Sequence, residues 1–423
     1  MSAAKTFVIE TYGCQMNVHD SERIAGLLLN AGYEQALEGS DPDLVVFNTC
    51  AVRENADNKL YGRLSFLAPR KRKDKDFQIA VGGCMAQKDQ ATIIKRAPYV
   101  DVVFGTHNIG SLPVLLERSR IEEAAQVEIK EALEHFPSTL PSRRHSPFSA
   151  WVSISVGCNN TCTFCIVPQL RGPEKDRDEK DIVREAQTLV DQGVIEITLL
   201  GQNVNAYHGL DESGHPASLG HLLTYVSQVS GIKRIRYTTS HPLEMDENLA
   251  NAHRDIPAVM PYLHLPVQSG SDKILSAMNR RHKIKDYHDA IAMMRRKRPD
   301  IAFSSDFIVG FPGETDEDFK ATLSLVEQVG FASAYTFKYS VRPGTPASEM
   351  DDQISEEVKD QRLHRLQALI AQQQRAYQDS MHPPWSLAKG GVQDRLCCSH
   401  EGSGRRGCLQ VLGEAWTAGV GRP

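Results

Sequence analysis

Three cysteines lie close together near the middle of the chain, spaced as Cys158-x-x-x-Cys162-x-x-Cys165. This spacing would also align three thiols on one face of a helix, so a buried structural stripe is one interpretation. Gly157 before the run and Pro168 after it disfavour a regular helix through the segment. We therefore expect a strand end followed by a polar loop that carries three thiols.

The number of thiols in this loop bears on which metal they would bind. Structural zinc sites need four ligands and usually pair two short cysteine motifs, whereas this loop offers three without a nearby partner. An iron–sulfur cubane normally takes four cysteines, so three would leave one iron open to a substrate or cofactor. Zinc and inert thiols remain alternatives, and the sequence favours a three-cysteine iron–sulfur cluster.

A second set of cysteines is spread over the first hundred residues. Cys14, Cys50 and Cys84 each follow an expected strand, and the carboxyl ends of parallel strands meet at one edge of a sheet, where ligands bind. Three thiols would then face one point, although buried cysteines with a purely structural role are the competing interpretation. We expect a second three-cysteine cluster.

The elements that must position these thiols follow an α/β pattern. Short apolar runs alternate with helical patterns over residues 1–120, which is typical of a parallel sheet. The expected strands are Lys5–Glu10, Leu44–Asn48, Gln78–Val81 and Val102–Phe104, and the expected helices are Ser21–Ala31, about Glu54–Leu67 and Ala91–Arg96.

Residues 121–148 turn acidic and then rich in proline, serine and arginine, which indicates a linker. A second α/β series over residues 149–380 indicates a barrel or partial barrel with a closing helix at Ser355–Asp379. Its expected strands are Trp151–Val156, Glu196–Leu200, Arg234–Tyr237, Tyr262–Leu265, Ala302–Ile308 and Ala334–Tyr339. Its expected helices are Lys180–Gln192, Leu219–Val229, Asp286–Arg298 and Thr315–Val329.

The composition is that of a globular protein, with 41% apolar and 24% charged residues. Lysine and arginine total 48 against 53 acidic residues, a net charge of −5, which excludes a uniformly basic nucleic-acid coat. We expect a cytoplasmic protein without a membrane segment, in which the nine cysteines serve metal or redox chemistry before disulfides.

Several motifs resemble the methylthiotransferase branch of the radical S-adenosylmethionine (SAM) enzymes, over about Thr6 to Asp379. The closest resemblance is to the tRNA-2-methylthio-N(6)-dimethylallyladenosine synthases. The motifs are Tyr12-Gly-Cys-Gln-Met-Asn17, Asn48-Thr-Cys-Ala-Val-Arg53, Gly82-Gly-Cys-Met85, Gly157-Cys-Asn-Asn-Thr-Cys-Thr-Phe-Cys-Ile-Val-Pro168, Leu199-Leu-Gly-Gln-Asn-Val-Asn205 and Asp306-Phe-Ile-Val-Gly-Phe-Pro-Gly-Glu314.

The resemblance implies an N-terminal domain with an auxiliary [4Fe–4S] cluster on Cys14, Cys50 and Cys84, followed by a radical SAM (β/α)6 partial barrel. The catalytic cluster would be held by the loop cysteines, and its open iron would bind SAM. Four further residues would contact SAM by the same resemblance: Phe164 through its backbone, and Gln202, Asn203 and Gln268 at strand ends.

The implied reaction adds a methylthio group to carbon 2 of N(6)-dimethylallyladenosine beside the anticodon of tRNA. A 5′-deoxyadenosyl radical would remove the inert ring hydrogen, with an electron donor such as flavodoxin or ferredoxin, and we expect a monomer. Alternatives are a methylthiotransferase that acts on threonylcarbamoyladenosine tRNA or on a ribosomal-protein aspartate, or a truncated, non-catalytic iron–sulfur protein.

The chain departs from the family near its end. Residues 381–423 do not resemble the RNA-binding TRAM domain that usually follows the closing helix, and we expect an irregular tail and impaired tRNA affinity. Cys397, Cys398 and Cys408 in this tail lack the spacing of a metal site. Basic runs at Arg70–Lys73, Arg280–Lys283 and Arg295–Arg298 are candidate RNA contacts.

Overall fold

The computed structural model describes residues 4–51, 54–130, 136, 141–144 and 146–381. Residues 1–377 form one compact unit, and residues 378–423 form a second, of which the described part is the end of one helix. The expected irregular tail, with its three cysteines, lies outside the described residues from 382 onward. Among the described residues no helix is both long enough and apolar enough to cross a membrane.

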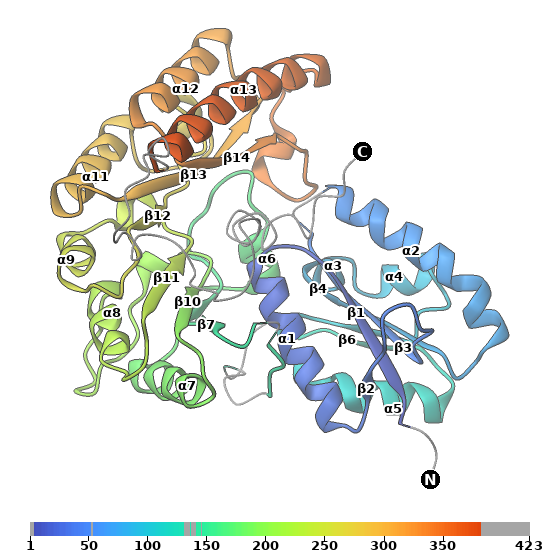
Figure 1. Ribbon diagram of the computed structural model, residues 1–423. Coiled ribbons are helices and arrows are strands. Elements are labelled where there is room, and N and C mark those ends of the chain that lie inside the picture. Colours follow the sequence, from blue (N-terminus) through green and yellow to red (C-terminus); the bar gives the residue numbers. More distant parts are fainter. Residues whose placement is uncertain (1–3, 52–53, 131–135, 137–140, 145, 382–423) are drawn as a thin grey trace, which may run out of the picture. The chain divides into compact units, whose positions relative to one another are not determined.

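The N-terminal part is built on a six-stranded parallel sheet in the order β2-β1-β3-β4-β5-β6 (Figure 1). Two apolar clusters show that helices cover both faces: α1 and α5 pack on one face, and α2, α3 and α4 pack on the other. The elements are β1 (Thr6–Tyr12), α1 (Gln15–Asn30), β2 (Glu34–Gln35), β3 (Leu44–Thr49), α2 (Glu54–Lys73), β4 (Gln78–Gly83), α3 (Cys84–Asp89), α4 (Ala91–Arg96), β5 (Val102–Phe104), α5 (Leu112–Glu122) and β6 (Gln126–Glu128).

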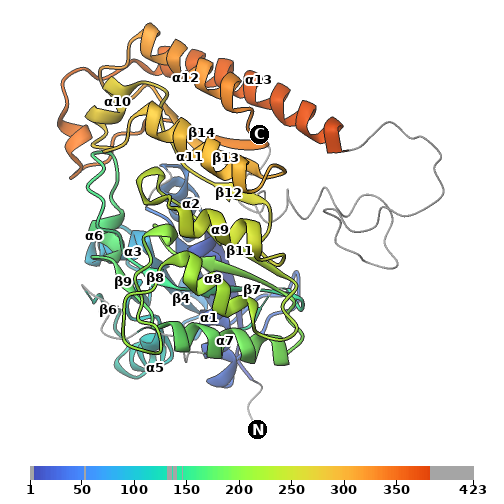
Figure 2. The ribbon, with the colours of Figure 1, turned by 90° about the vertical axis from the view of Figure 1, so that its left-hand side faces the viewer.

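The second part is a partial barrel of six parallel strands in chain order. β7, β10 and β11 form one sheet and β12, β13 and β14 form another, and a parallel bridge from Ile235 to Val259 lies between them. Helices α7, α8, α9, α11 and α12 follow one another along the outer side (Figures 1 and 2). The strands are β7 (Ser149–Ser153), β10 (Glu196–Leu200), β11 (Arg234–Thr238), β12 (Tyr262–His264), β13 (Ala302–Val309) and β14 (Ser333–Lys338).

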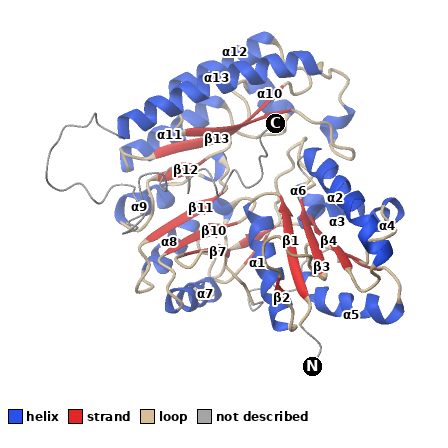
Figure 3. Ribbon diagram, turned by 45° about the vertical axis from the view of Figure 1, so that its right-hand side comes forward, coloured by secondary structure: helices blue, strands red, loops and turns tan. Residues whose placement is uncertain are grey.

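Helical periodicity explains the outer layer. In α7 the buried side chains are Ile182, Ala186 and Leu189, which recur at the spacing of one helix face and join the apolar core of the barrel. The helices are α6 (Val167–Arg171), α7 (Glu179–Asp191), α8 (Leu219–Ser227), α9 (Glu247–Asp255), α10 (Asp272–Ala277), α11 (Ile284–Lys297), α12 (Asp316–Val329) and α13 (Glu356–Met381). The expected α/β architecture is confirmed: Figure 3 shows a parallel-sheet α/β part followed by a partial barrel of strands with helices outside.

Details differ from the sequence-based expectations at the ends of elements. Helix α1 begins at Gln15 rather than Ser21, and Gln126–Glu128 pairs with β5 as an edge strand although residues 121–148 were expected to be a linker. The expected strand Trp151–Val156 divides into β7 and β8 (Ser155–Val156), and β8 pairs antiparallel with β9 (Lys175–Asp176). The split matters because β8 leads directly into the cysteine loop.

Candidate functional site

The first set of thiols, Cys158, Cys162 and Cys165, is called the loop set. Its loop follows β8 and starts at Gly157, which has a φ of +84°. A Cβ at Gly157 would lie 2.1 Å from the carbonyl oxygen of Pro173, so only glycine fits this close approach. The segment forms no regular helix until Val167, as the sequence predicted.

Each thiol of the loop set contacts a nitrogen donor. Cys158 Sγ accepts from the Asn160 backbone N–H at 3.4 Å, and Cys165 Sγ accepts from the Val167 N–H at 3.4 Å. Arg280 Nη1 lies 3.8 Å from Cys162 Sγ. Donors of this kind stabilise thiolates and tune the potential of a bound iron–sulfur group, so the loop set fits a three-thiolate cluster.

Burial favours the protonated form of two of these thiols, Cys158 and Cys165, until a metal competes for them. The pKa of Cys165 is raised to about 11, chiefly by burial and in part by the neighbouring Cys162 and Cys158 thiols, while the Val167 N–H opposes the rise. Burial likewise raises the pKa of Cys158. Metal binding would release these protons and relieve the mutual repulsion, which couples loading to pH.

The second set, Cys14, Cys50 and Cys84, is called the sheet set. In the ladder of strands β1, β3 and β4, Tyr12 pairs with Thr49 and Thr49 pairs with Gly83. Cys50 and Cys84 therefore follow two paired residues directly, and Cys14 follows Tyr12 by two residues. The register places all three cysteines at one edge of the sheet, at the carboxyl ends of adjacent strands.

A buried amide pair fixes this edge. Asn17 Nδ2 donates to Asn48 Oδ1 at 3.1 Å, and Asn48 Nδ2 donates to the Asn17 carbonyl at 2.7 Å. The Cys14 Sγ–H donates to Asn17 Oδ1 at 3.4 Å, so the pair also orients one thiol. A Cβ at Gly83 would lie 2.4 Å from Asn48 Oδ1, and Cys84 is the first residue of α3 rather than part of a loop.

The two sets approach each other through helix α6, which follows the loop set in sequence. Cys84 packs with Ile166 and Leu170 in one small apolar cluster, and α6 lies against α3. Thr106 Oγ1 also donates to the Leu170 carbonyl at 3.2 Å. The elements that carry the two sets are therefore in direct contact within one compact unit.

Two arginines that the sequence did not single out lie between the sets. Arg171 ends α6 and forms a buried ion pair with Asp20, 3.0 Å from Nη2 to Oδ2. Arg342 Nη1 donates to the Phe164 carbonyl at 2.9 Å. Burial lowers the pKa of Arg342, and the thiols Cys165 and Cys50, one from each set, oppose that shift. No periodicity marks either arginine, and the one sequence signal is that Arg171 lies three residues after the motif that ends at Pro168.

Two of the residues expected to contact SAM, Gln202 and Asn203, follow the end of β10. Gln202 Oε1 accepts from the Gly157 N–H at 2.5 Å, which joins the end of β10 to the cysteine loop. Its Nε2 and the Oδ1 of Asn203 are buried without a hydrogen-bond partner among the described residues. Unpaired buried amides are costly, so they suit a polar guest such as an amino acid group.

The other two expected SAM contacts have different surroundings. Gln268 follows β12 and has a φ of +76°, and its backbone pairs with β13 through Asp306 and Ile308. The ring of Phe164 packs against the apolar cluster around Phe311, and its carbonyl is occupied by Arg342. Its backbone carbonyl is therefore already engaged in this structure.

A separate group of possible ligands lies beside the loop set. Glu174, Asp176 and His208 each offer one ligand atom within 4.8 Å of the others, and the Glu174 N–H donates to Asn159 Oδ1 at 3.1 Å. Burial raises the pKa of Glu174 to about 7, and the charges of Asp176 and Glu244 add to the rise. This carboxyl would therefore carry a proton for about half the time near neutral pH.

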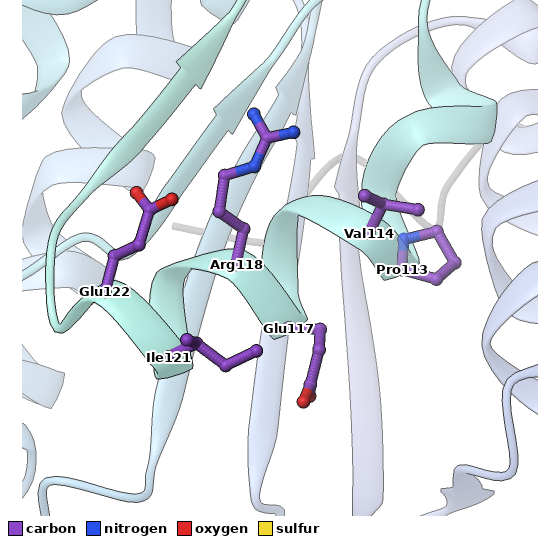
Figure 4. A pocket seen from close by; sticks show the side chains of 6 residues that line it. All are labelled: Pro113, Val114, Glu117, Arg118, Ile121 and Glu122. Atoms are coloured by element: carbon purple, nitrogen blue, oxygen red, sulfur yellow. The ribbon is translucent and has the colours of Figure 1, made fainter.

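A surface hollow lies elsewhere, along the outer face of α5. Its lining residues are Pro113, Val114, Glu117, Arg118, Ile121 and Glu122 (Figure 4). None of them is a cysteine or one of the expected SAM contacts. The candidate site is therefore the region of the two cysteine sets.

Comparisons with known families agree with this division. A model described as Uncharacterized protein family UPF0004 matches residues 6–105, and a model described as Radical SAM superfamily matches residues 152–326. The first range contains the sheet set and the second contains the loop set.

Relatives with high identity carry one name. The chain is 59% identical over 371 residues to a tRNA-2-methylthio-N(6)-dimethylallyladenosine synthase of Streptomyces viridosporus, which covers 87% of this chain and 73% of that protein. It is 55% identical over 415 residues to a protein of the same name from Mycolicibacterium vanbaalenii, with 96% and 81% covered.

Solved structures share the fold at low identity. The radical SAM methyltransferase TsrM from Kitasatospora setae, with cobalamin and a [4Fe–4S] cluster bound, is similar with a TM-score of 0.57 at 13% identity, over 82% of this chain and 77% of that one. The cobalamin-dependent radical enzyme OxsB is similar with a TM-score of 0.54 at 13% identity, over 88% and 56%. Both similarities concern the fold alone.

Proposed function

Because this chain belongs to the family of tRNA-2-methylthio-N(6)-dimethylallyladenosine synthases and is a radical SAM methylthiotransferase, we propose that it transfers a methylthio group to carbon 2 of N(6)-dimethylallyladenosine beside the anticodon of tRNA. Iron–sulfur clusters and SAM are the cofactors of this enzyme class. In our proposal the loop set holds one [4Fe–4S] cluster and the sheet set holds another. Since tRNA is the substrate in this proposal, we place the reaction in the cytoplasm.

One observation carries the two-cluster proposal. The ends of three register-paired strands present the sheet set, and α6, which follows the loop set, packs against the helix that Cys84 begins. A hydrogen on an aromatic carbon is inert to ordinary acids and bases. When bound, the clusters and SAM supply the radical that removes this hydrogen and the methylthio unit that replaces it.

The chain's own residues bind and orient these groups. The loop thiols and their N–H donors would hold the first cluster, and three thiols would leave one of its four irons without a cysteine ligand. The unpaired amides of Gln202 and Asn203 bind the amino and carboxylate groups of SAM. The apolar cluster of Cys84, Ile166 and Leu170 excludes water from the space beside the sheet set. An electron donor such as flavodoxin or ferredoxin completes the proposal.

Nucleoside mass spectrometry tests the proposed substrate. The chain is expressed in cells that lack their own methylthiolating enzyme, and the modified nucleosides of their tRNA are identified. We expect methylthio-dimethylallyladenosine. Methylthiolated threonylcarbamoyladenosine, or a methylthiolated ribosomal protein with unmodified tRNA, would instead identify one of the alternative substrates.

Cysteine variants test the assignment of two clusters. Cys158→Ala should abolish both 5′-deoxyadenosine and the methylthio product, whereas Cys84→Ala should abolish the product and leave SAM cleavage. The iron content should fall from about eight to about four per chain in either variant, as loss of one cubane requires. Cys398→Ala, outside both sets, is the matched control. Full iron content in Cys84→Ala would contradict the second cluster.

A further inference from the structure

Arg171 has an unusual position for a charged residue. Its side chain is 6% exposed, and it lies at the end of α6, six residues after Cys165 of the loop set. Its partner Asp20 is 8% exposed and lies on α1, six residues after Cys14 of the sheet set. The ion pair therefore joins the helix that follows one cysteine set to the helix that follows the other.

Helix α6 also packs against α3, whose first residue is Cys84. Burial raises the pKa of the Cys84 thiol and the charge of Arg171 opposes this rise, while the charges of Cys84 and Cys14 act on Arg171 in turn. An arginine has five N–H donors in a planar fork, so it can hold Asp20 and a cysteine sulfur at the same time. The neighbouring His19 is fully buried, and burial together with Arg23, Arg177 and Arg171 lowers its pKa, so it adds no positive charge.

A buried ion pair is a poor source of stability, because desolvation of both charges offsets their attraction. Well-packed apolar side chains of similar size would serve the contact between α6 and α1 at least as well. A cation is useful here if the sheet set carries negative charge. Three thiolates around an iron–sulfur group give that charge, and one-electron reduction increases it.

We propose that Arg171 is a positioning residue for the iron–sulfur group of the sheet set: held by Asp20, it donates a hydrogen bond to the sulfur of Cys84 and stabilises the reduced form of the group. This inference rests on the proposed function, in which the sheet set holds a cluster. Because Arg171 belongs to α6, the potential of that cluster depends on the helix that follows the other cysteine set.

The test measures a redox potential rather than activity. The full chain carries Cys158→Ser, Cys162→Ser and Cys165→Ser, so that the sheet set holds the one remaining cluster, and its midpoint potential is measured by an EPR-monitored titration. Arg171→Gln removes the positive charge and should lower the equilibrium constant for reduction by about tenfold, which is about 59 mV for a one-electron couple. Arg171→Lys keeps the charge and should restore most of the potential.

Asp20→Asn gives a change of opposite sign. It removes the negative charge that partly neutralises Arg171, so the potential should rise, whereas a purely structural role predicts similar damage from both substitutions. The matched control is Arg362→Gln. Arg362 is a buried arginine that pairs with Glu314 at a distance of 2.8 Å, and this pair does not belong to either cysteine set. The midpoint potential of the cluster in the Arg362→Gln variant should equal that in the parent protein.

Each remaining outcome decides the matter. A loaded Arg171→Gln variant with an unchanged potential overturns the inference, as does Asp20→Asn with a lowered potential. If Arg171→Gln loads no iron, the other two variants test the inference. A raised potential in Asp20→Asn together with a nearly unchanged potential in Arg171→Lys supports it, and any other result overturns it. If the parent with the intact sheet set binds no iron, the proposed second cluster fails, and the inference fails with it for that separate reason.

Discussion

Gln202 uses the two ends of its side-chain amide for different purposes. Its Oε1 accepts from the Gly157 N–H at 2.5 Å and so holds the start of the cysteine loop, while its Nε2 is buried and has no partner among the described residues. A free donor at this position is costly unless a guest accepts from it. The SAM carboxylate is a suitable acceptor in the proposed function.

Replacement of Gln202 by leucine should therefore weaken SAM binding. The change keeps a similar volume and removes both polar atoms, and we expect the dissociation constant of SAM to rise about tenfold, or about 1.4 kcal/mol. Anaerobic isothermal titration calorimetry on variants of equal iron content measures this. Gln187→Leu on the exposed face of α7 is the control. An unchanged dissociation constant would show that Gln202 does not contact SAM.

At the scale of elements, a buried histidine joins helix α9 to strand β11. His253 is fully buried, and its Nε2 lies 2.7 Å from the hydroxyl oxygen of Tyr237. Burial, with a smaller contribution from Arg298, lowers the pKa of His253 to about 4. The imidazole is therefore neutral in the folded chain over the whole range in which an unfolded histidine, with a pKa near 6.5, gains its proton.

This depressed pKa predicts how stability depends on pH. Between pH 6.5 and 4 the unfolded state binds more protons than the folded state, so the free energy of unfolding falls as the pH falls. From pH 7 to pH 5 the contribution of His253 should fall by about 2 kcal/mol. His253→Gln should lack this pH-dependent contribution. The difference between the urea midpoints of the wild-type protein and the variant should therefore become smaller from pH 7 to pH 5. His364→Gln, exposed on α13, should keep the wild-type profile.

The sequence was sufficient for the four central strands of the sheet and for its cysteines, but not for the edge strands or for the residues around the cysteines. Short apolar strands and the rule that parallel strand ends share an edge predicted where Cys14, Cys50 and Cys84 would gather. Helix α1 was expected to begin at Ser21, because its earlier turns are polar. Those turns are nevertheless buried, since Asn17, His19 and Asp20 face the site, and hydrophobic periodicity cannot detect buried polar residues.

Across the whole molecule, contacts between distant segments likewise limit what could be predicted from the sequence. Arg171 meets Asp20 across 151 positions of the sequence, and Arg342 meets Phe164 across 178. Neither pair has a local pattern, and each forms because the fold brings distant segments of the chain together. Site chemistry was predictable where a motif holds it, and not where the fold assembles it.

The chain has a net charge of −5, so binding of tRNA would depend on local groups of basic side chains. Most side chains of the basic runs have internal roles: Lys71 pairs with Asp101 at 2.8 Å, and Lys297 pairs with Glu247 at 3.0 Å. The run Arg280–Lys283 differs in its position, because it lies beside the loop set. There Arg281 and Lys283 are exposed, and Arg281 Nη2 lies 3.5 Å from Asn160 Oδ1 in the cysteine loop.

In the proposed function, we expect these two cations to contact tRNA phosphates beside the site. The double variant Arg281→Ala/Lys283→Ala should weaken tRNA binding and reduce the slope of log K against log salt by about 1.5, as loss of two phosphate contacts requires. Filter binding at several salt concentrations measures both quantities. Arg184→Ala/Lys320→Ala removes two exposed cations from α7 and α12, outside the basic runs, and gives the same net charge, so it is the matched control. Equal slopes for the two double variants would mean that the backbone of the tRNA is held elsewhere, because a general effect of net charge would act on both alike.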